Sequence, residues 1–230
     1  MIVEEMVRGR ALDRYATLAS RETINHLKSQ SFIESFNSND RATFRLEVPQ
    51  VTAKIDFLRN IIISIQKGKS IKSNGSYEFN LDADEDQRKD SDILVNLVLP
   101  HKYTEDFSFI SCLIPELKET FRHELEHSSQ STEDLMAVQR VVPNREIWKD
   151  IETAENYYLS DAEIQAHIAG IYKKAKSFKK PSTSVLKKVL VGIYNTGLLY
   201  NLDSKKLSNL IDKIQDRWTD YLFKRYPRAQ

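Results

Sequence analysis

The segment 121–127 reads Phe121-Arg122-His123-Glu124-Leu125-Glu126-His127 and contains the pattern His-Glu-x-x-His, on which the predicted fold and chemistry depend. In a helix, His123 and His127 lie one turn apart on the same face, so both imidazoles can reach one metal ion. Glu124 places a carboxylate beside that ion without being a ligand to it. A carboxylate in this place suits a general base that takes a proton from a metal-bound water.

Zinc is the ion that these residues predict, at one Zn2+ per chain. Neutral imidazole is a borderline ligand that suits Zn2+, and a bound Zn2+ lowers the pKa of its water to about 7. Coincidence is the alternative, because a charged helix end such as residues 122–127 is usually only solvated surface. The chain has only five histidines, which are few for the full pattern to arise by chance, and the pattern falls in a helical context. We therefore expect a metal site with His123 and His127 as ligands and Glu124 as the base.

The surrounding residues predict a helix that begins near Pro115, which suits a first helical turn, and ends at Ser128. Three apolar side chains recur every four residues and form a stripe for burial: Leu117, Phe121 and Leu125. His123 and His127 lie about 200 degrees from the last two of these on a helical wheel. The helix can therefore bury one face and direct the motif into a cleft.

Alternating polar and apolar residues before this helix predict the strands of a sheet. Residues 43–48 and 77–81 alternate, and residues 93–99 form a strong apolar strand. Residues 57–65 are rich in isoleucine and fit either a strand or a helix. Asn74-Gly75, between apolar stretches, predicts a hairpin turn.

Helical patterns dominate both ends of the chain. Residues 3–27 predict one amphipathic helix outside the main sheet, and residues from 145 onward predict a series of helices with Ser160, Ser182 or Thr183, and Asp203 as N-caps. The expected fold is α+β, a small antiparallel or mixed sheet packed on the His-Glu-x-x-His helix, with an N-terminal helix and an all-helical C-terminal portion. Three parts are expected: an N-terminal helical extension (1–40), a central domain that carries the motif (41–180) and a C-terminal helical hairpin packed on it (181–230).

Composition excludes several classes of protein. The 230 residues carry a net charge of +1, so no overall field favours nucleic acid or an acidic membrane, although lysines gather between Lys173 and Lys188. Cys112 is the only cysteine, so neither an intrachain disulfide nor a cysteine zinc cluster is possible. The start lacks the pattern of a signal peptide, and no apolar run approaches the roughly 20 residues of a membrane span. We expect a cytoplasmic protein that binds neither membrane nor nucleic acid, with its oligomeric state open.

A catalytic zinc usually has three protein ligands and one open position. The candidates after His127 are Asp161, Glu163, His167 and the acidic residues between 133 and 155. We favour Glu163, which opens a helix 36 positions after His127 and is followed by the small residue Ala166, where a second helix can pack closely. His167, one turn after Glu163, is a substitute ligand, a partner of a ligating carboxylate, a transition-state donor or a structural histidine.

His123-Glu124-x-x-His127 followed by Glu163-x-x-Ala166 on a later helix resembles the gluzincin group of zincin metallopeptidases. The segment 158–166, Tyr-Leu-Ser-Asp-Ala-Glu-Ile-Gln-Ala, is more loosely similar to a motif of uncharacterised zincin-like proteins, many of which phages encode. The resemblance covers residues 92–169 and implies a small zincin fold, in which the strand at 93–99 is an antiparallel edge strand above the metal helix and binds an extended peptide. The continuation His-x-x-Gly-x-x-His, typical of metzincins, is absent.

Glu163 has a second interpretation that needs no metal. Ser160-Asp161-Ala162-Glu163 is a capping box, in which a glutamate at the third helical position folds back onto the cap amide. Glu163 cannot be a full ligand and a full cap partner at once, and the need for a third ligand favours the metal. Tyr157 and Tyr158 precede this helix and are either oxyanion donors or core residues.

These residues together predict a zinc-dependent peptidase of the zincin type that acts on a peptide or protein substrate. His123, His127 and Glu163 are expected to hold Zn2+, and Glu124 is expected to take the proton of the attacking water. The alternative is a catalytically silent protein with the zincin fold that binds a partner or belongs to a phage particle, because more than half of the chain lies outside the resemblance. For a phage protein, the expected compartment is the host cytoplasm.

Overall fold

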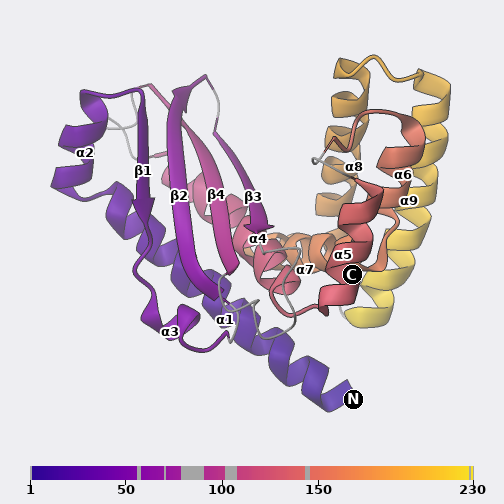
Figure 1. The fold of residues 1–230 in the computed structure, drawn as a ribbon, viewed down its shortest axis with the longest axis horizontal. Helices are drawn as coiled ribbons and strands as arrows, with labels where there is room; N and C mark the ends of the chain where they lie inside the picture. The colour runs from indigo at the N-terminus through magenta and orange to yellow at the C-terminus, as the bar shows by residue number, and fades with distance from the viewer. Residues whose placement is uncertain are drawn as a thin grey trace. The chain divides into compact units, whose positions relative to one another are not determined.

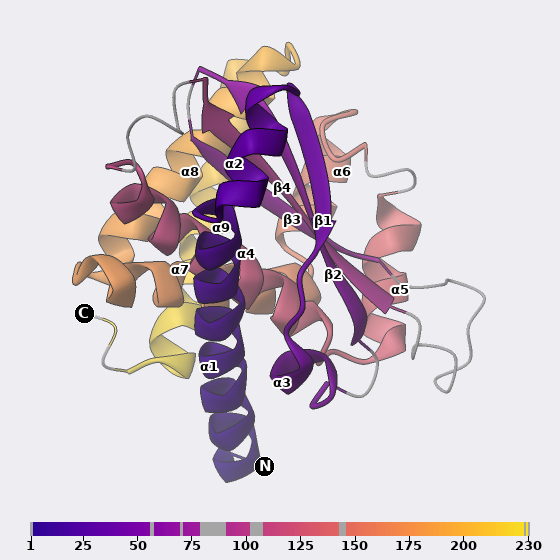
Figure 2. The ribbon, with the colours of Figure 1, turned by 90° about the vertical axis from the view of Figure 1, so that its left-hand side faces the viewer.

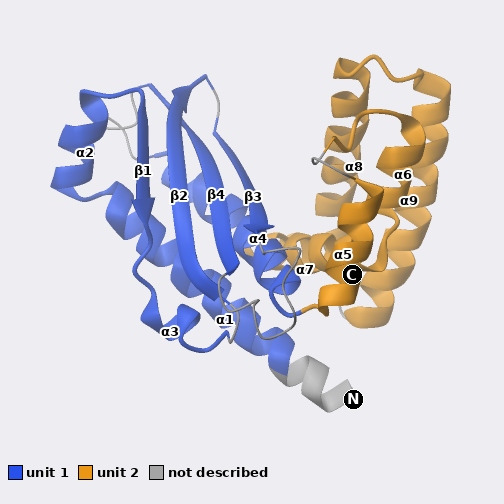
Figure 3. Ribbon diagram, viewed as in Figure 1, with its two compact units in different colours: residues 1–129 blue, residues 130–230 orange. Residues whose placement is uncertain are grey.

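The computed structural model describes residues 2–55, 58–69, 71–78, 91–101, 108–142, 146–227 and 229, with side chains from residue 8 onward. Within these residues the fold is α+β, with one small mixed sheet of four strands and nine helices, which confirms the expected class. The chain divides into two compact units, Met1–Ser129 and Gln130–Gln230 (Figure 3). The boundary between the units falls after Ser129, just after the motif helix, and the three parts expected at 1–40, 41–180 and 181–230 stay a prediction.

Unit 1, residues 1–129, contains the four-stranded sheet (Figure 1). Its strands are β1 (Arg41–Arg45), β2 (Leu58–Gly68), β3 (Lys72–Glu78) and β4 (Ser91–Pro100). The strand order is β1-β2-β4-β3, in which β2 and β4 are parallel and the other two pairs are antiparallel. Strand β4 therefore lies inside the sheet, and β1 and β3 are its edges.

Two details of the predicted sheet were wrong. The strand at 93–99 was expected at an edge, but β4 is hydrogen-bonded on both sides, and β3 is the antiparallel edge strand next to it. Asn74-Gly75 was expected in a hairpin turn, but both residues lie within β3 and pair with β4. The reason is that β4 inserts between β2 and β3, so these consecutive strands do not form a hairpin. The strand predicted at 77–81 continues β3 to Glu78, and its last residues lie outside the described part of the chain.

The buried face of the sheet is aliphatic. The isoleucine-rich segment 57–65, which fits a strand or a helix from its sequence, contributes to β2 from Leu58 onward, and the isoleucines at 61, 63 and 65 are buried. In the parallel register these three face Ile93, Val95 and Leu97 of β4, which are buried as well. Because side chains alternate along a strand, the six residues form one continuous apolar face.

Two helices lie on this side of the sheet, one against the strands and the other against the first helix. Helix α4 (Ile110–His127) packs on β3 and β4, and helix α1 (Ile2–Leu27) packs along α4 on the same side (Figures 1 and 2). The stripe predicted for α4 is fully buried: Leu117, Phe121 and Leu125. Pro115 lies inside α4 rather than in its first turn, because the helix begins earlier than its sequence predicts. Unit 1 also contains the short helices α2 (Gln30–Asn37) and α3 (Pro49–Thr52).

A buried ion cluster joins α4 to α1. The Arg122 guanidinium is completely buried, and its Nε donates to Oδ1 of Asp13 on α1 at 3.0 Å. Its Nη1 donates to Glu126, one turn further along α4, whose side chain is also buried. Charges removed from water are tolerated only when they are paired, so this cluster ties the rotation of α4 to the position of Asp13.

Unit 2, residues 130–230, is helical wherever the structure describes secondary structure in it. Its helices are α5 (Thr132–Val141), α6 (Ile151–Tyr158), α7 (Asp161–Phe178), α8 (Ser182–Leu199) and α9 (Ser204–Arg225). Trp218 of α9 is fully buried in their shared core, and its indole Nε1 donates to the carbonyl of Tyr158 at 2.9 Å. Ser160 and Asp203 cap α7 and α9 as predicted, since each side chain accepts from the amide three residues later. The cap predicted at Ser182 or Thr183 was wrong, because α8 begins at Ser182 and the residue at its N-cap position, Pro181, makes no side-chain cap hydrogen bond. Among the described helices, none has the length and apolar character needed to span a membrane.

Arg122→Met should lower the free energy of unfolding by about 3–5 kcal/mol, because it removes the cation from two carboxylates while it keeps most of the apolar stem. Urea unfolding followed by circular dichroism measures the change. The control is Arg21→Met, which breaks an exposed ion pair with Glu22 and should cost less than about 1 kcal/mol. Similar losses in both variants would contradict a structural role for the buried cluster.

An aromatic cluster at the end of α1 should make folding sensitive to pH. His26 stacks on Phe44 of β1 with ring centroids 3.7 Å apart, and its ring lies 5.3 Å from that of Phe32 on α2. Burial in this cluster lowers the pKa of His26 below 6.5. Protonation therefore favours the unfolded chain, so the stability that this group contributes is complete above pH 6.5 and is lost as the pH falls through the folded-state pKa.

The melting temperature of the wild type should therefore fall more between about pH 7.5 and pH 5.5 than that of His26→Phe, which keeps an aromatic ring but does not titrate. Both proteins are melted in the presence of a chelator, so that metal binding by other histidines does not contribute. An equal fall in the two proteins would remove His26 as a source of the pH dependence.

Candidate metal centre

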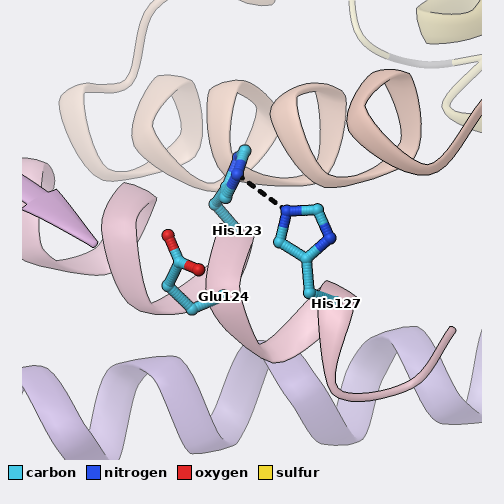
Figure 4. A group of neighbouring side chains, drawn as sticks. All are labelled: His123, Glu124 and His127. Carbon is cyan, nitrogen blue, oxygen red and sulfur yellow. Dashed lines mark hydrogen bonds between the residues drawn. The ribbon is translucent and has the colours of Figure 1, made fainter. Parts of the chain in front are cut away.

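Helix α4 brings His123 and His127 together as their spacing predicts. Their Nε2 atoms are 3.1 Å apart, and the ring centroids are 4.7 Å apart with the planes at 78°. Figure 4 shows the two imidazoles with their ring nitrogens turned toward one another. A carboxylate oxygen of Glu124 and one nitrogen of each imidazole all lie within 4.8 Å of one another. The motif therefore forms a compact group of possible ligands and a carboxylate.

The nitrogen pair fits a zinc ion. Zn–N bonds of about 2.0–2.1 Å at a tetrahedral angle place two ligand nitrogens roughly 3.3 Å apart. The observed separation of 3.1 Å differs from this value by an amount that a small side-chain rotation supplies. A hydrogen bond between two imidazole nitrogens needs a proton on one of them, whereas a metal ion accepts the lone pairs of both.

The motif is not a solvated helix surface, which was the alternative from sequence. Glu124 is 3% exposed and His127 is 6% exposed, and Arg122 and Glu126 are buried as well. His123 is half-buried. Burial of so many ionisable groups is costly unless each is paired, hydrogen-bonded or bound to a metal. This segment of α4 therefore needs partners that an ordinary surface helix does not.

Strand β3 lies against the side of α4 that carries Glu124. The hydroxyls of Ser73 and Thr120 form a hydrogen bond of 2.8 Å that joins the strand to the helix. Two residues further along β3, the backbone of Gly75 approaches Glu124 so closely that a Cβ atom there would lie 2.7 Å from its Cγ and Oε1. The carboxylate beside the histidine pair is thus also next to the antiparallel edge strand.

Glu163 lies in unit 2, in the first turn of α7, and is 5% exposed. The Ser160 hydroxyl accepts its backbone N–H at 3.3 Å, which is the first half of the predicted capping box. The Ser160 N–H, however, donates to the carbonyl of Tyr157 at 3.2 Å. The Glu163 carboxylate is directed instead to His167, with Oε2 3.5 Å from Nε2. The backbone of Glu163 is therefore in the cap, while its side chain contacts the next turn of α7.

Aromatic rings surround His167 within unit 2. Its imidazole stacks on Trp218 with centroids 4.7 Å apart and planes 26° apart, and it lies 5.8 Å from the ring of Tyr158. Burial, and next the negative charge of Glu163, raise the pKa of Tyr158, so the phenol keeps its proton. Tyr158 is therefore a core residue in unit 2, with a hydroxyl that can donate but does not ionise near neutral pH.

Sequence reasoning missed two residues that shape this centre. Gly75 was predicted in a turn, because Asn-Gly is a hairpin signal. The pattern does not indicate what packs against the glycine. Arg122 was considered only as part of the alternative, a solvated helix end, although a glutamate four positions later, Glu126, is a signal for an ion pair along a helix. That spacing indicates the pair but not its burial, which depends on α1.

Comparison of the chain with profiles of known protein families, with curated proteins and with solved structures finds no match. The candidate centre is therefore defined by its own residues and distances. Its described residues belong to both units: the His-Glu-x-x-His group is part of unit 1, and the pair Glu163 and His167 is part of unit 2.

His123→Ala and His127→Ala should each abolish zinc binding, whereas the wild type should hold about one zinc per chain, because two nitrogens 3.1 Å apart are both needed as ligands. Elemental analysis of protein purified without an affinity metal, then loaded with zinc and dialysed, measures the content. The control is His101→Ala, which removes an exposed histidine outside the motif. A wild type that retains no zinc, or histidine variants that retain it fully, would contradict the metal centre.

Proposed function

We propose that this protein is a zinc-dependent peptidase of the zincin type, in which His123, His127 and Glu163 hold the ion and Glu124 is the general base. The proposal rests above all on the two Nε2 atoms that converge at 3.1 Å beside a buried carboxylate and an edge strand. A structural zinc site is normally closed by four protein ligands. Two histidines with an adjacent carboxylate that is not a ligand suit an open, catalytic site better.

Glu163 is the third ligand in this proposal. It is supported by its place on a helix after the motif, by the burial of its side chain and by its contact of 3.5 Å with His167. A carboxylate ligand is commonly held by a further hydrogen bond, which fixes its orientation and tunes the metal. His167, whose Nε2 lies 3.5 Å from Oε2 of Glu163 as an ion-pair contact, is assigned the role of orienting this carboxylate rather than the role of a ligand.

The proposed reaction is hydrolysis of a peptide bond. When bound, Zn2+ supplies a water of lowered pKa and polarises the scissile carbonyl. Glu124 takes a proton from the attacking water and passes it to the amine nitrogen as the carbon–nitrogen bond breaks, so the carboxylate ends the cycle ionised. Burial of Glu124 keeps bulk water away from this proton transfer.

An extended peptide is the form of substrate that β3 favours. An edge strand can pair its backbone N–H and C=O groups with an added strand. A peptide added to β3 would run beside the part of α4 that carries Glu124, because Gly75 of β3 lies against that residue. The zincin fold is part of the proposal, with β3 in the role that the sequence had assigned to the strand at 93–99.

A catalytically silent binding protein or phage-particle protein is the alternative, and unit 2 contains the observation that favours it. Large apolar side chains are exposed on α8 and at its C-terminal end: Val191, Leu198, Leu199 and Tyr200. Exposed apolar side chains in such number suit contact with a partner. This alternative predicts zinc binding without hydrolysis.

Three variants together test the proposed function. Glu124→Gln should keep zinc but lose about 10²–10⁴-fold in rate, because an amide cannot accept the proton. Glu163→Ala should lose both zinc and hydrolysis, because two histidines alone rarely hold a catalytic zinc. Ser160→Ala removes the cap but no ligand, so it should keep both properties at a stability cost of about 1 kcal/mol. Elemental analysis gives the zinc content, and the release of fluorescence from labelled, denatured casein gives the rate.

Each possible result has a definite reading. Full hydrolysis by folded Glu124→Gln would overturn the proposal. Zinc retained by Glu163→Ala, with only a loss of stability, would assign the Glu163 carboxylate to its structural contact with His167 instead of the metal. A wild type that binds zinc but hydrolyses neither denatured nor native proteins would favour the silent binding protein.

A further inference from the structure

Gly75 lacks a side chain at a position where one would collide with the Glu124 carboxylate. A Cβ atom at this residue would lie 2.7 Å from Cγ and Oε1 of Glu124 and 2.9 Å from its Cδ, and these are its three nearest heavy atoms. Gly75 does not have the positive φ that favours glycine, so its conformation is open to other residues. Glycine is therefore needed here for space and not for backbone geometry.

The strand cannot easily move away from the helix to make room. The Ser73 hydroxyl is hydrogen-bonded to Thr120 of α4 at 2.8 Å, two residues before Gly75 in the same strand. Gly75 itself pairs with Val95 of β4, whose side chain is buried in the core of the sheet. An added methyl group would therefore displace the Glu124 side chain rather than the strand.

We propose that Gly75 is a positioning residue for the general base: its missing side chain lets the Glu124 carboxylate lie against the backbone of β3, beside His123 and His127. This inference rests on the proposed function of Glu124. An alanine at this position pushes the carboxylate out of its place but leaves both imidazoles where they are, since the collision involves Glu124 alone among its nearest atoms. Gly75 thus controls the proton transfer and not the binding of zinc.

A double-mutant cycle on metal-free protein tests the contact without reference to activity. Gly75→Ala should lower the melting temperature by several degrees in the wild-type background. In the Glu124→Ala background it should cause no loss, because the three atoms with which the methyl collides are gone. The control cycle pairs Glu124→Ala with Gly68→Ala, whose added Cβ collides with Val98 instead, so these two changes should be additive.

Kinetics on zinc-loaded protein test the consequence for the reaction. With labelled, denatured casein as the probe, Gly75→Ala should lower kcat by about 10- to 100-fold, since a small misplacement of a reacting group has effects of this size. KM and the zinc content should remain close to those of the wild type. A merely structural role would not separate kcat from KM in this way.

The outcomes distinguish this inference from the proposed function. Additive melting temperatures for Gly75→Ala and Glu124→Ala, an unchanged kcat, or loss of zinc from Gly75→Ala would each overturn the positioning role. If Gly75→Ala does not fold, folding of the double variant with Glu124→Ala supports the contact, and failure of both overturns it. If the wild type does not hydrolyse the substrate, both the role of Gly75 in catalysis and the proposed function are contradicted. The double-mutant cycle of melting temperatures still decides whether a side chain at position 75 collides with Glu124.

Discussion

The arrangement of the motif depends on the ion cluster of Arg122 with Asp13 and Glu126. Successive residues of a helix point about 100 degrees apart, so the direction of one side chain sets the directions of its neighbours. Once Arg122 is held toward Asp13 of α1, His123 and Glu124 are directed to other sides of α4. A salt bridge on one face thus orients the possible ligands on another. This salt bridge fixes the orientation of α4 as much as it adds stability, because a buried ion pair stabilises a fold little more than apolar packing does.

Unit 1 combines this costly segment with an apolar sheet. The residues from Arg122 to His127 place several ionisable side chains out of water within two helical turns. Replacement of such groups by well-packed apolar residues is often neutral or stabilising, so their presence is unexpected in a helix with only a structural role. The aliphatic face formed by β2 and β4 can offset the cost through burial of apolar area. Helix α4 therefore contributes both an apolar stripe that stabilises the fold and a segment of ionisable side chains whose burial costs free energy.

Much of this organisation could be predicted from local patterns. The buried stripe of α4, the caps of α7 and α9 and the α+β class follow from spacing and capping chemistry, which act over a few residues. The order of the strands could not be predicted in this way. Nothing local in residues 93–99 indicates that they insert between β2 and β3, because strand order depends on contacts between distant segments. The pattern Asn74-Gly75 failed for the same reason, since the helix that needs the space lies almost fifty residues later.

Glu163 shows why a capping signature cannot decide between a structural and a chemical role. The sequence Ser160-Asp161-Ala162-Glu163 was weighed as a choice between a cap and a ligand. In the structure the backbone N–H of Glu163 belongs to the cap, whereas its carboxylate contacts His167 one turn later. The serine alone satisfies the amide, so the box needs only half of its pattern. A glutamate at the third position of a helix can therefore complete a cap through its backbone and keep its side chain for a partner on the same face.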